Sequence, residues 1–153
     1  IDELMQLWNV MIGDMSLVGP RPNVKRETDL YTTEEKRLLS VRPGITDISS
    51  IVFSDLNDLL ASSTNPNLDY NQLVRPWKSR LGLIYVDNSS LFLDIKLIVL
   101  TLLGMASRRL VLSEIHKLLT GLKVDAQVIQ VAKRETALTP FPPPGATQVV
   151  TNR

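Results

Sequence analysis

The sequence predicts an α+β domain that is mostly helical, with several amphipathic helices around a short pair of strands. Three observations support this fold class. Apolar residues recur at helical spacing over 1–11, 69–86 and 91–107. Hydrophobic residues make up 44% of the 153 residues, which is enough for one packed domain. Two short segments, 15–18 and 45–53, are apolar or β-branched and are predicted to be extended.

The composition excludes several kinds of protein and site. The formal net charge is +1, so no overall positive field indicates nucleic acid, and we expect no nucleic-acid partner. The absence of cysteine excludes disulfides and thiolate metal sites. His116 is the only histidine, which excludes a histidine-rich zinc site, and we interpret its side chain as solvated.

The first 22 residues organise the rest of the chain. They begin with a predicted helix that ends at Gly13, a residue type common just after helices. Asp2 and Glu3 lie in its first turn, where the backbone amides favour negative charge. The apolar stripe of this helix consists of Leu4, Leu7, Trp8 and Met11.

Arg21 lies between Pro20 and Pro22, and the two prolines keep its backbone stiff and extended. A guanidinium held in this way presents a planar, permanently charged fork to phosphate oxygens. An acidic pair together with such an arginine is what metal-assisted phosphoryl chemistry requires. The alternative interpretation is that the acids only complement the helix dipole and that Pro-Arg-Pro is only a rigid turn.

Three sequence blocks together resemble a known family. They are Asp-Glu-Leu-x-Gln-Leu-x-Asn-Val, then Gly-Asp-Met-Ser-Leu-Val-Gly-Pro-Arg-Pro, and then Ser-Val-Arg-Pro-Gly-Ile-Thr at 40–46. This pattern is similar to the bacterial sugar transferases, the monotopic polyprenyl-phosphate phosphoglycosyl transferases. The similarity is nearly continuous over 1–46 and resumes at 85–86 and 90–103.

The resemblance implies an enzyme that moves a sugar 1-phosphate from a UDP-sugar to polyprenyl phosphate through a covalent aspartyl intermediate. In this sequence Asp2 would be the nucleophile, and Glu3 would be its partner. Asp2 and Glu3 would be the ligands of a Mg²⁺ cofactor, or Glu3 would instead help with the acceptor. Arg21 would clamp the phosphates, and Arg42, which also precedes a proline, would make a second anionic contact.

The resemblance also implies a location at the membrane surface, on the cytoplasmic face of the bacterial inner membrane. Because the chain starts at Ile1 inside the motif, we expect an N-terminally truncated catalytic part. One alternative is a non-catalytic membrane-surface or partner-binding domain, and another is a soluble module that binds nucleotide sugars.

Two positions depart from the family pattern. Many members have an aspartate three residues before the Tyr-Val pair at 85–86, where this chain has Gly82. The family usually has glycine after Ile-Thr, where this chain has Asp47. These departures leave the sugar and the donor pocket open.

We divide the chain into a catalytic core at 1–109, a helical extension at 110–135 and a proline-rich tail at 136–153 that is expected to be extended or disordered. Within the core, residues 91–107 form a strongly apolar predicted helix. Charged residues interrupt it before the ~20 apolar residues that a spanning helix needs. It is therefore either a core helix or one at the membrane interface, where the following pair Arg108-Arg109 would suit anionic headgroups.

Local signals predict further elements. A short helix is expected at 23–30, and Thr32 and Glu35 have capping-box spacing before a helix that reaches about Ser40. Two apolar residues of that helix, Leu38 and Leu39, are assigned to the core. A basic face on the helix at 69–86 is interpreted as solvated or as a contact for headgroups or a nucleotide diphosphate; it consists of Arg75, Lys78 and Arg80.

Overall fold

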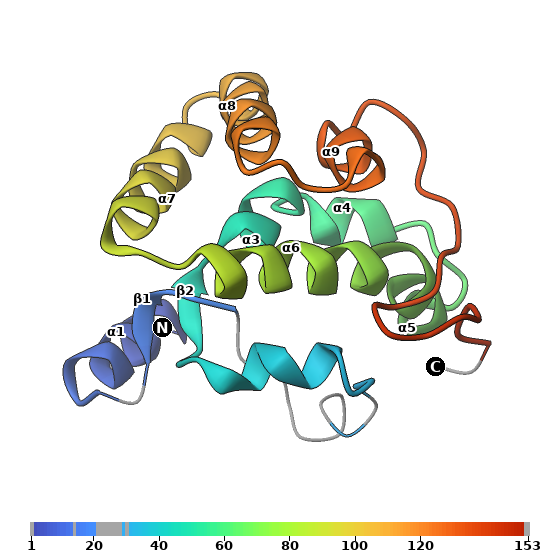
Figure 1. Ribbon diagram of the computed structural model, residues 1–153, viewed down its shortest axis with the longest axis horizontal. Helices are drawn as coiled ribbons and strands as arrows, with labels where there is room; N and C mark the ends of the chain where they lie inside the picture. The colour runs from blue at the N-terminus through green and yellow to red at the C-terminus, as the bar shows by residue number, and fades with distance from the viewer. Residues whose placement is uncertain (1, 14, 21–28, 30, 152–153) are drawn as a thin grey trace.

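The computed structural model describes residues 2–13, 15–20, 29 and 31–151, with side chains from Leu4 onward. It confirms the predicted fold class, because helices predominate around one two-stranded sheet. Helix α6 (Arg75–Asn88) runs through the middle of the molecule, and the other helices are arranged around it (Figure 1).

Helix α1 (Asp2–Met11) and strand β1 (Ser16–Val18) confirm the two predicted halves of the opening segment. Between them Gly13 has a φ of +90°, a left-handed conformation that glycine adopts without strain. This residue reverses the chain, so β1 returns toward the body of the domain.

Strand β2 (Gly44–Thr46) pairs with β1 in parallel, with Ser16 opposite Gly44. A Cβ atom on Gly44 would overlap the backbone nitrogen of Gly19. Glycine at 44 is therefore required by the close approach of the two backbones.

The predicted strand at 45–53 is wrong beyond Thr46. The chain instead forms helix α3 (Ile48–Val52), because the Asp47 carboxylate accepts a hydrogen bond from the backbone N–H of Ser50 at 2.9 Å and caps the helix. Ile48, Ile51 and Val52 then lie on one buried face, and all three belong to the main hydrophobic core.

The capping box is confirmed in the 3₁₀-helix η1 (Glu35–Ser40). The Thr32 N–H donates to Glu35 Oε1 at 3.2 Å, and the Glu35 N–H donates to Thr32 Oγ1 at 3.1 Å. Leu38 is buried as predicted, whereas the assignment of Leu39 to the core is wrong because its side chain is 58% exposed. The helix predicted at 23–30 lies almost entirely outside the described residues.

Three short elements lead into α6. They are helix α4 (Leu56–Leu60), helix α5 (Pro66–Asp69) and the π-helical turn η2 (Tyr70–Val74). The helical pattern predicted for 69–86 is thus confirmed, with the irregular turn placed just before Pro76. Trp77, Leu81 and Tyr85 of this helix are buried in the core.

Three helices follow α6: α7 (Leu91–Gly104), α8 (Arg108–Gly121) and α9 (Ala126–Ala132). Helix α7 is part core and part surface. Its buried residues are Leu93, Leu97 and Leu100, and its exposed apolar residues are Leu91, Phe92, Ile95, Val99 and Leu102. None of the described helices combines the length and the apolar character that crossing a bilayer requires.

The described part of the tail, residues 136–151, has no helix or strand and is packed against the domain. It runs from α9 down to α5 (Figure 1). The Phe141 ring lies 4.7 Å from the Trp77 ring between centroids, and the Phe141 N–H donates to the Gln72 carbonyl at 3.1 Å. Apolar contact and a backbone hydrogen bond thus hold this segment against the domain.

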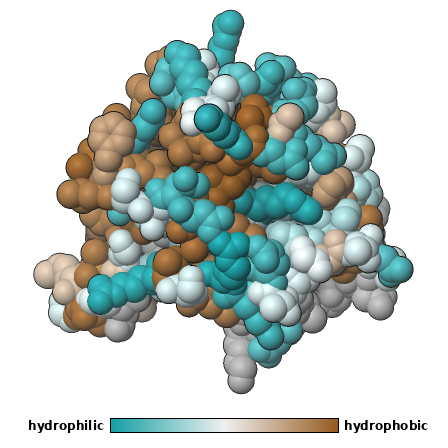
Figure 2. Space-filling model, viewed as in Figure 1, coloured by the Kyte–Doolittle hydropathy of each residue, from teal (hydrophilic) through white to brown (hydrophobic). Residues whose placement is uncertain are grey.

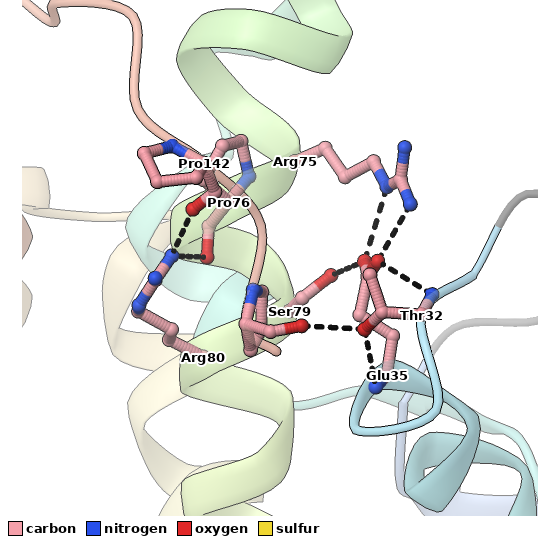
Figure 3. A network of polar contacts seen from close by, with 8 residues as sticks. Thr32, Glu35, Arg75, Pro76, Ser79, Arg80 and Pro142 are labelled. Carbon is pink, nitrogen blue, oxygen red and sulfur yellow. Dashed lines mark hydrogen bonds and ion pairs between the residues drawn. The ribbon is translucent and has the colours of Figure 1, made fainter. Parts of the chain in front are cut away.

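The predicted basic face of α6 is also wrong. Arg75 is buried and forms an ion pair with Glu35 at 2.5 Å (Figure 3). The Arg80 guanidinium donates to the Pro76 and Pro142 carbonyls at 2.9 Å each. Lys78 lies 5.6 Å from the Tyr70 ring centroid. The first two cations thus join segments of the fold, and the third lies against an aromatic ring.

Candidate functional site

Of the four predicted site residues, the structure describes the side chain of Arg42 alone. Asp2 and Glu3 begin α1, but their side chains lie outside what the structure describes. Arg21 also lies outside the described residues. Arg42 is exposed on the link that enters β2. The predicted meeting of the acidic pair with Arg21 therefore stays a prediction.

A cavity of about 520 Å³ lies beside α1. Gln6 and Leu7 line it, and they follow Asp2 and Glu3 by one helical turn on the same faces of α1. The cavity thus borders the helix that carries the acidic pair. Its polar lining consists of Gln6, Thr46, Ser50, Ser54, Thr101 and Arg108.

Two threonines fix the wall between β2 and α7. Thr101 Oγ1 donates to the Leu97 carbonyl at 2.8 Å, and it lies 2.8 Å from Thr46 Oγ1. Because the Thr101 hydroxyl donates its proton to the Leu97 carbonyl, the Thr46 hydroxyl is the donor in the hydrogen bond between the two threonines. The wall is therefore a rigid surface whose hydroxyl protons are already used.

Arg108 supplies a cation at the edge of this cavity. Its guanidinium donates to Ser54 Oγ at 2.6 Å, to the Val52 carbonyl at 3.1 Å and to Asp55 Oδ1 at 3.2 Å. The sequence suggested only a headgroup contact for this arginine. Its position depends on the end of α3, more than fifty residues away, and no local pattern reveals that.

Asp55 is shared by two arginines. Arg134 donates to its two carboxylate oxygens at 2.8 and 3.1 Å, and Arg108 approaches from the other side. Partial burial alone would raise the pKa of Asp55, but the hydrogen bond and the charges of Arg134 and Arg108 outweigh it. The pKa of Asp55 therefore lies below its ordinary value.

We expect Asp55→Asn to lower the free energy of unfolding by about 2 kcal/mol at pH 7, because it leaves the largely buried Arg134 without its counter-ion. A lowered carboxylate pKa stabilises the fold above the unfolded-state value, and that stabilisation is lost as pH falls through the folded value. Urea unfolding of both proteins should show the difference shrinking below about pH 4. A difference that stays constant down to pH 2 would contradict this assignment.

Arg42 borders a second groove, of about 660 Å³, which is separate from the cavity beside α1. In this groove the Tyr85 hydroxyl donates to Asp94 Oδ1 at 2.6 Å. Burial, with the hydrogen bond and charge of Asp94, raises the pKa of Tyr85, so the hydroxyl stays protonated at neutral pH. Arg42 therefore lines this groove and is not among the described residues that line the cavity beside α1.

The departure at Asp47 is structural. Its carboxylate is fully buried and accepts hydrogen bonds from Ser49 Oγ, Ser50 Oγ and the Ser50 N–H. Burial raises the pKa of Asp47, and these hydrogen bonds partly oppose that rise. Asp47 thus caps α3 and holds Ser50, which lines the cavity beside α1.

The departure at Gly82 is explained by packing. Gly82 is buried in α6, and a Cβ atom there would lie 2.7 Å from Leu38 Cδ2 in η1. Position 82 therefore faces the contact between α6 and η1 rather than either of the two cavities described above.

We expect Gly82→Asp to lower the free energy of unfolding by at least about 3 kcal/mol, because it overpacks Leu38 and buries an unpaired carboxylate. The matched control is Gly121→Asp, where a new Cβ meets nothing within 4 Å, so the change should stay within about 1 kcal/mol. Chemical denaturation of the three proteins measures both changes. Equal stability of the two variants would show that position 82 has room.

Among the residues whose side chains are described, no three acidic or histidine side chains gather closely enough to hold a metal ion. That search does not reach the Asp2 and Glu3 side chains. A Mg²⁺ site at these residues is therefore untested by the structure.

A family model described as bacterial sugar transferase matches residues 1–108. The chain is 40% identical over 102 residues to the galactosyl transferase CpsE of Streptococcus agalactiae, an alignment that covers 67% of this chain and 19% of CpsE. It is 42% identical over 101 residues to the uncharacterized sugar transferase EpsL of Bacillus subtilis, covering 66% of this chain and 42% of EpsL.

A shorter alignment joins the chain to the undecaprenyl-phosphate galactose phosphotransferase of Salmonella typhimurium, with 46% identity over 59 residues. It covers 39% of this chain and 12% of that protein. The chain thus spans less than half the length of each of these three relatives.

Proposed function

This chain belongs to the bacterial sugar transferase family, and from this premise we propose that its protein transfers a sugar 1-phosphate from a UDP-sugar to polyprenyl phosphate. The product would be a polyprenyl diphosphate sugar. The family match over residues 1–108 carries the proposal, because it includes α1 and nearly all of the cavity beside it. The name of the Salmonella relative supports undecaprenyl phosphate as the acceptor.

In the proposed reaction, a carboxylate oxygen of Asp2 attacks the sugar-linked phosphorus of the UDP-sugar. The bond from that phosphorus to the bridging oxygen breaks, UMP leaves with this oxygen, and an aspartyl sugar-phosphate forms. A phosphate oxygen of polyprenyl phosphate then attacks the same phosphorus and releases the Asp2 carboxylate. Covalent catalysis of this kind divides one difficult displacement into two easier ones.

The acidic pair suits a divalent cation, because Mg²⁺ prefers hard carboxylate oxygens. Asp2 and Glu3 would hold it, and when bound it neutralises charge on the diphosphate. In the alternative role, Glu3 would not bind the metal ion and would instead help the acceptor, polyprenyl phosphate, to react. Arg21 is proposed as the phosphate clamp, since a guanidinium can bind two oxygens at once. Arg42 is proposed for a second anionic contact, made from the groove that it shares with Tyr85.

We further propose that the domain works at the membrane surface, on the cytoplasmic face of the bacterial inner membrane. An apolar surface supports this: Figure 2 has apolar residues gathered on the side where α7 and α8 lie. Large exposed apolar areas mark surfaces that bind a membrane or a partner. The most exposed large apolar side chains of α7 and its C-cap are Leu91, Phe92, Leu102 and Met105, and those of α1 are Leu4, Met5, Trp8 and Met11.

Transfer of a radiolabelled sugar phosphate from UDP-sugars to undecaprenyl phosphate, with Mg²⁺, tests the proposed reaction in the full protein. We expect a labelled lipid that retains the sugar. The exposed apolar surface also favours a second function, that of a non-catalytic membrane-surface domain. Vesicle binding with no transfer from any UDP-sugar tested would support this second function and reject the first.

A further inference from the structure

A basic pocket of about 580 Å³ shares one lining residue, Arg108, with the cavity beside α1. Three of its lining residues, Arg108, Arg109 and His116, are on α8. Lys133 and Glu135 come from the segment that follows α9. All but Arg108 lie beyond the residues that match the family model, so the pocket depends on the C-terminal part of the chain.

Positive charge exceeds negative charge around this pocket. Arg109 is exposed and Lys133 is half-buried, and neither has an ion-pair partner within the described part of the chain. Arg108 must share the single carboxylate of Asp55 with Arg134. The residues that line the pocket therefore include three cations, Arg108, Arg109 and Lys133, and one carboxylate, Glu135. The excess of two positive charges suits a dianion.

The imidazole of His116 lies among these cations, because His116 is one of the residues that line the pocket. A ligand bound there therefore changes the surroundings of the ring.

We propose that this pocket binds a phosphate-bearing dianion. The Arg109 guanidinium can bind two phosphate oxygens as a planar fork, and the Lys133 ammonium adds a point charge from the segment that follows α9. The volume lies within the range of small-molecule sites, ~300–1,000 Å³. The site goes beyond the proposed sugar transfer, because it does not involve Asp2, Glu3, Arg21 or Arg42.

The single histidine makes a direct binding test simple, since every imidazole NMR signal belongs to His116. We expect inorganic pyrophosphate to shift these signals saturably at constant ionic strength. Arg109→Gln and Lys133→Gln should each weaken binding about tenfold, as expected for one charge-assisted contact. Glu135→Gln should strengthen it, because it removes the opposing carboxylate.

Lys117→Gln is the matched control: Lys117 is on the same helix, does not line the pocket and forms an exposed ion pair with Glu114. It should leave the affinity unchanged. Unsaturable shifts, or equal affinities in all four variants, would overturn the proposal. Neither result bears on sugar transfer, which is assayed separately.

Two sources of the phosphate group can then be separated with vesicles. Phosphatidylcholine vesicles with and without phosphatidic acid are compared for the chain and for Arg109→Gln. If the ligand is a lipid headgroup, binding that depends on phosphatidic acid should fall in the variant and be competed by pyrophosphate. If the ligand is soluble, vesicle binding should be unaffected by the substitution while pyrophosphate binding is weakened.

Discussion

Replacing Glu35 with alanine is expected to lower the free energy of unfolding by about 3–5 kcal/mol, a large part of the stability of a domain of this size. The Glu35 side chain is completely buried, and its carboxylate accepts hydrogen bonds from Nε and Nη2 of Arg75, at 3.0 and 2.5 Å (Figure 3). Ser79 Oγ adds a third bond at 2.6 Å. Removing the carboxylate deletes the negative partner of the buried ion pair and these three hydrogen bonds, and that loss is the main cost.

The adjacent residue provides the control. Glu34 pairs with Arg37 at 2.5 Å, but both side chains are more than 40% exposed. Exposed ion pairs contribute little, so Glu34→Ala should change the free energy of unfolding by less than about 1 kcal/mol. Urea unfolding at pH 7 measures both variants. Similar losses for the two substitutions would mean that the buried pair does not stabilise the fold in the way that its geometry implies.

The Glu35 cluster also anchors the tail. Thr32, whose backbone N–H binds Glu35, donates its hydroxyl to the Pro144 carbonyl at 2.5 Å. Arg80, one turn after Pro76 on α6, holds Pro142 (Figure 3). Segments near 32, 75–80 and 142–144 therefore meet in one polar network. This network explains why the proline-rich tail is ordered.

Elements whose signals are local were predictable from the sequence. The capping box of Thr32 and Glu35 and the helix end at Gly13 each depend on residues within a few positions of the backbone that they shape. The strand predicted through residue 53 failed because β-branched residues fit strands and short helices alike. There the cap formed by Asp47 decides in favour of the helix.

Features that depend on distant partners were not predictable. Arg75 looked like part of a solvated face because its partner, Glu35, is forty residues away. The cluster of Asp55, Arg108 and Arg134 likewise joins three separate segments. For the candidate site, the motif identified α1, and the structure adds the cavity along it. How Asp2, Glu3 and Arg21 are arranged around a substrate lies outside the described residues, so their assignment to the site rests on the sequence motif.

Asp2→Asn is expected to reduce sugar-phosphate transfer by the full protein at least about a thousandfold, because a neutral amide cannot act as the nucleophile. Asparagine is nearly the same size and is well tolerated at the start of a helix, so α1 should still form. Mass spectrometry gives a second readout: incubation with the UDP-sugar alone should add one sugar phosphate to the unsubstituted protein and none to the variant.

The control is Asp58→Asn, which makes the same chemical change at an exposed position of α4 that does not line the cavity beside α1. It should retain full transfer and form the covalent adduct. Full activity of the Asp2 variant would reject this residue as the nucleophile. Loss of transfer with the adduct still present would instead assign Asp2 to the second step, because the phosphorus would then be bonded to another side chain when polyprenyl phosphate attacks.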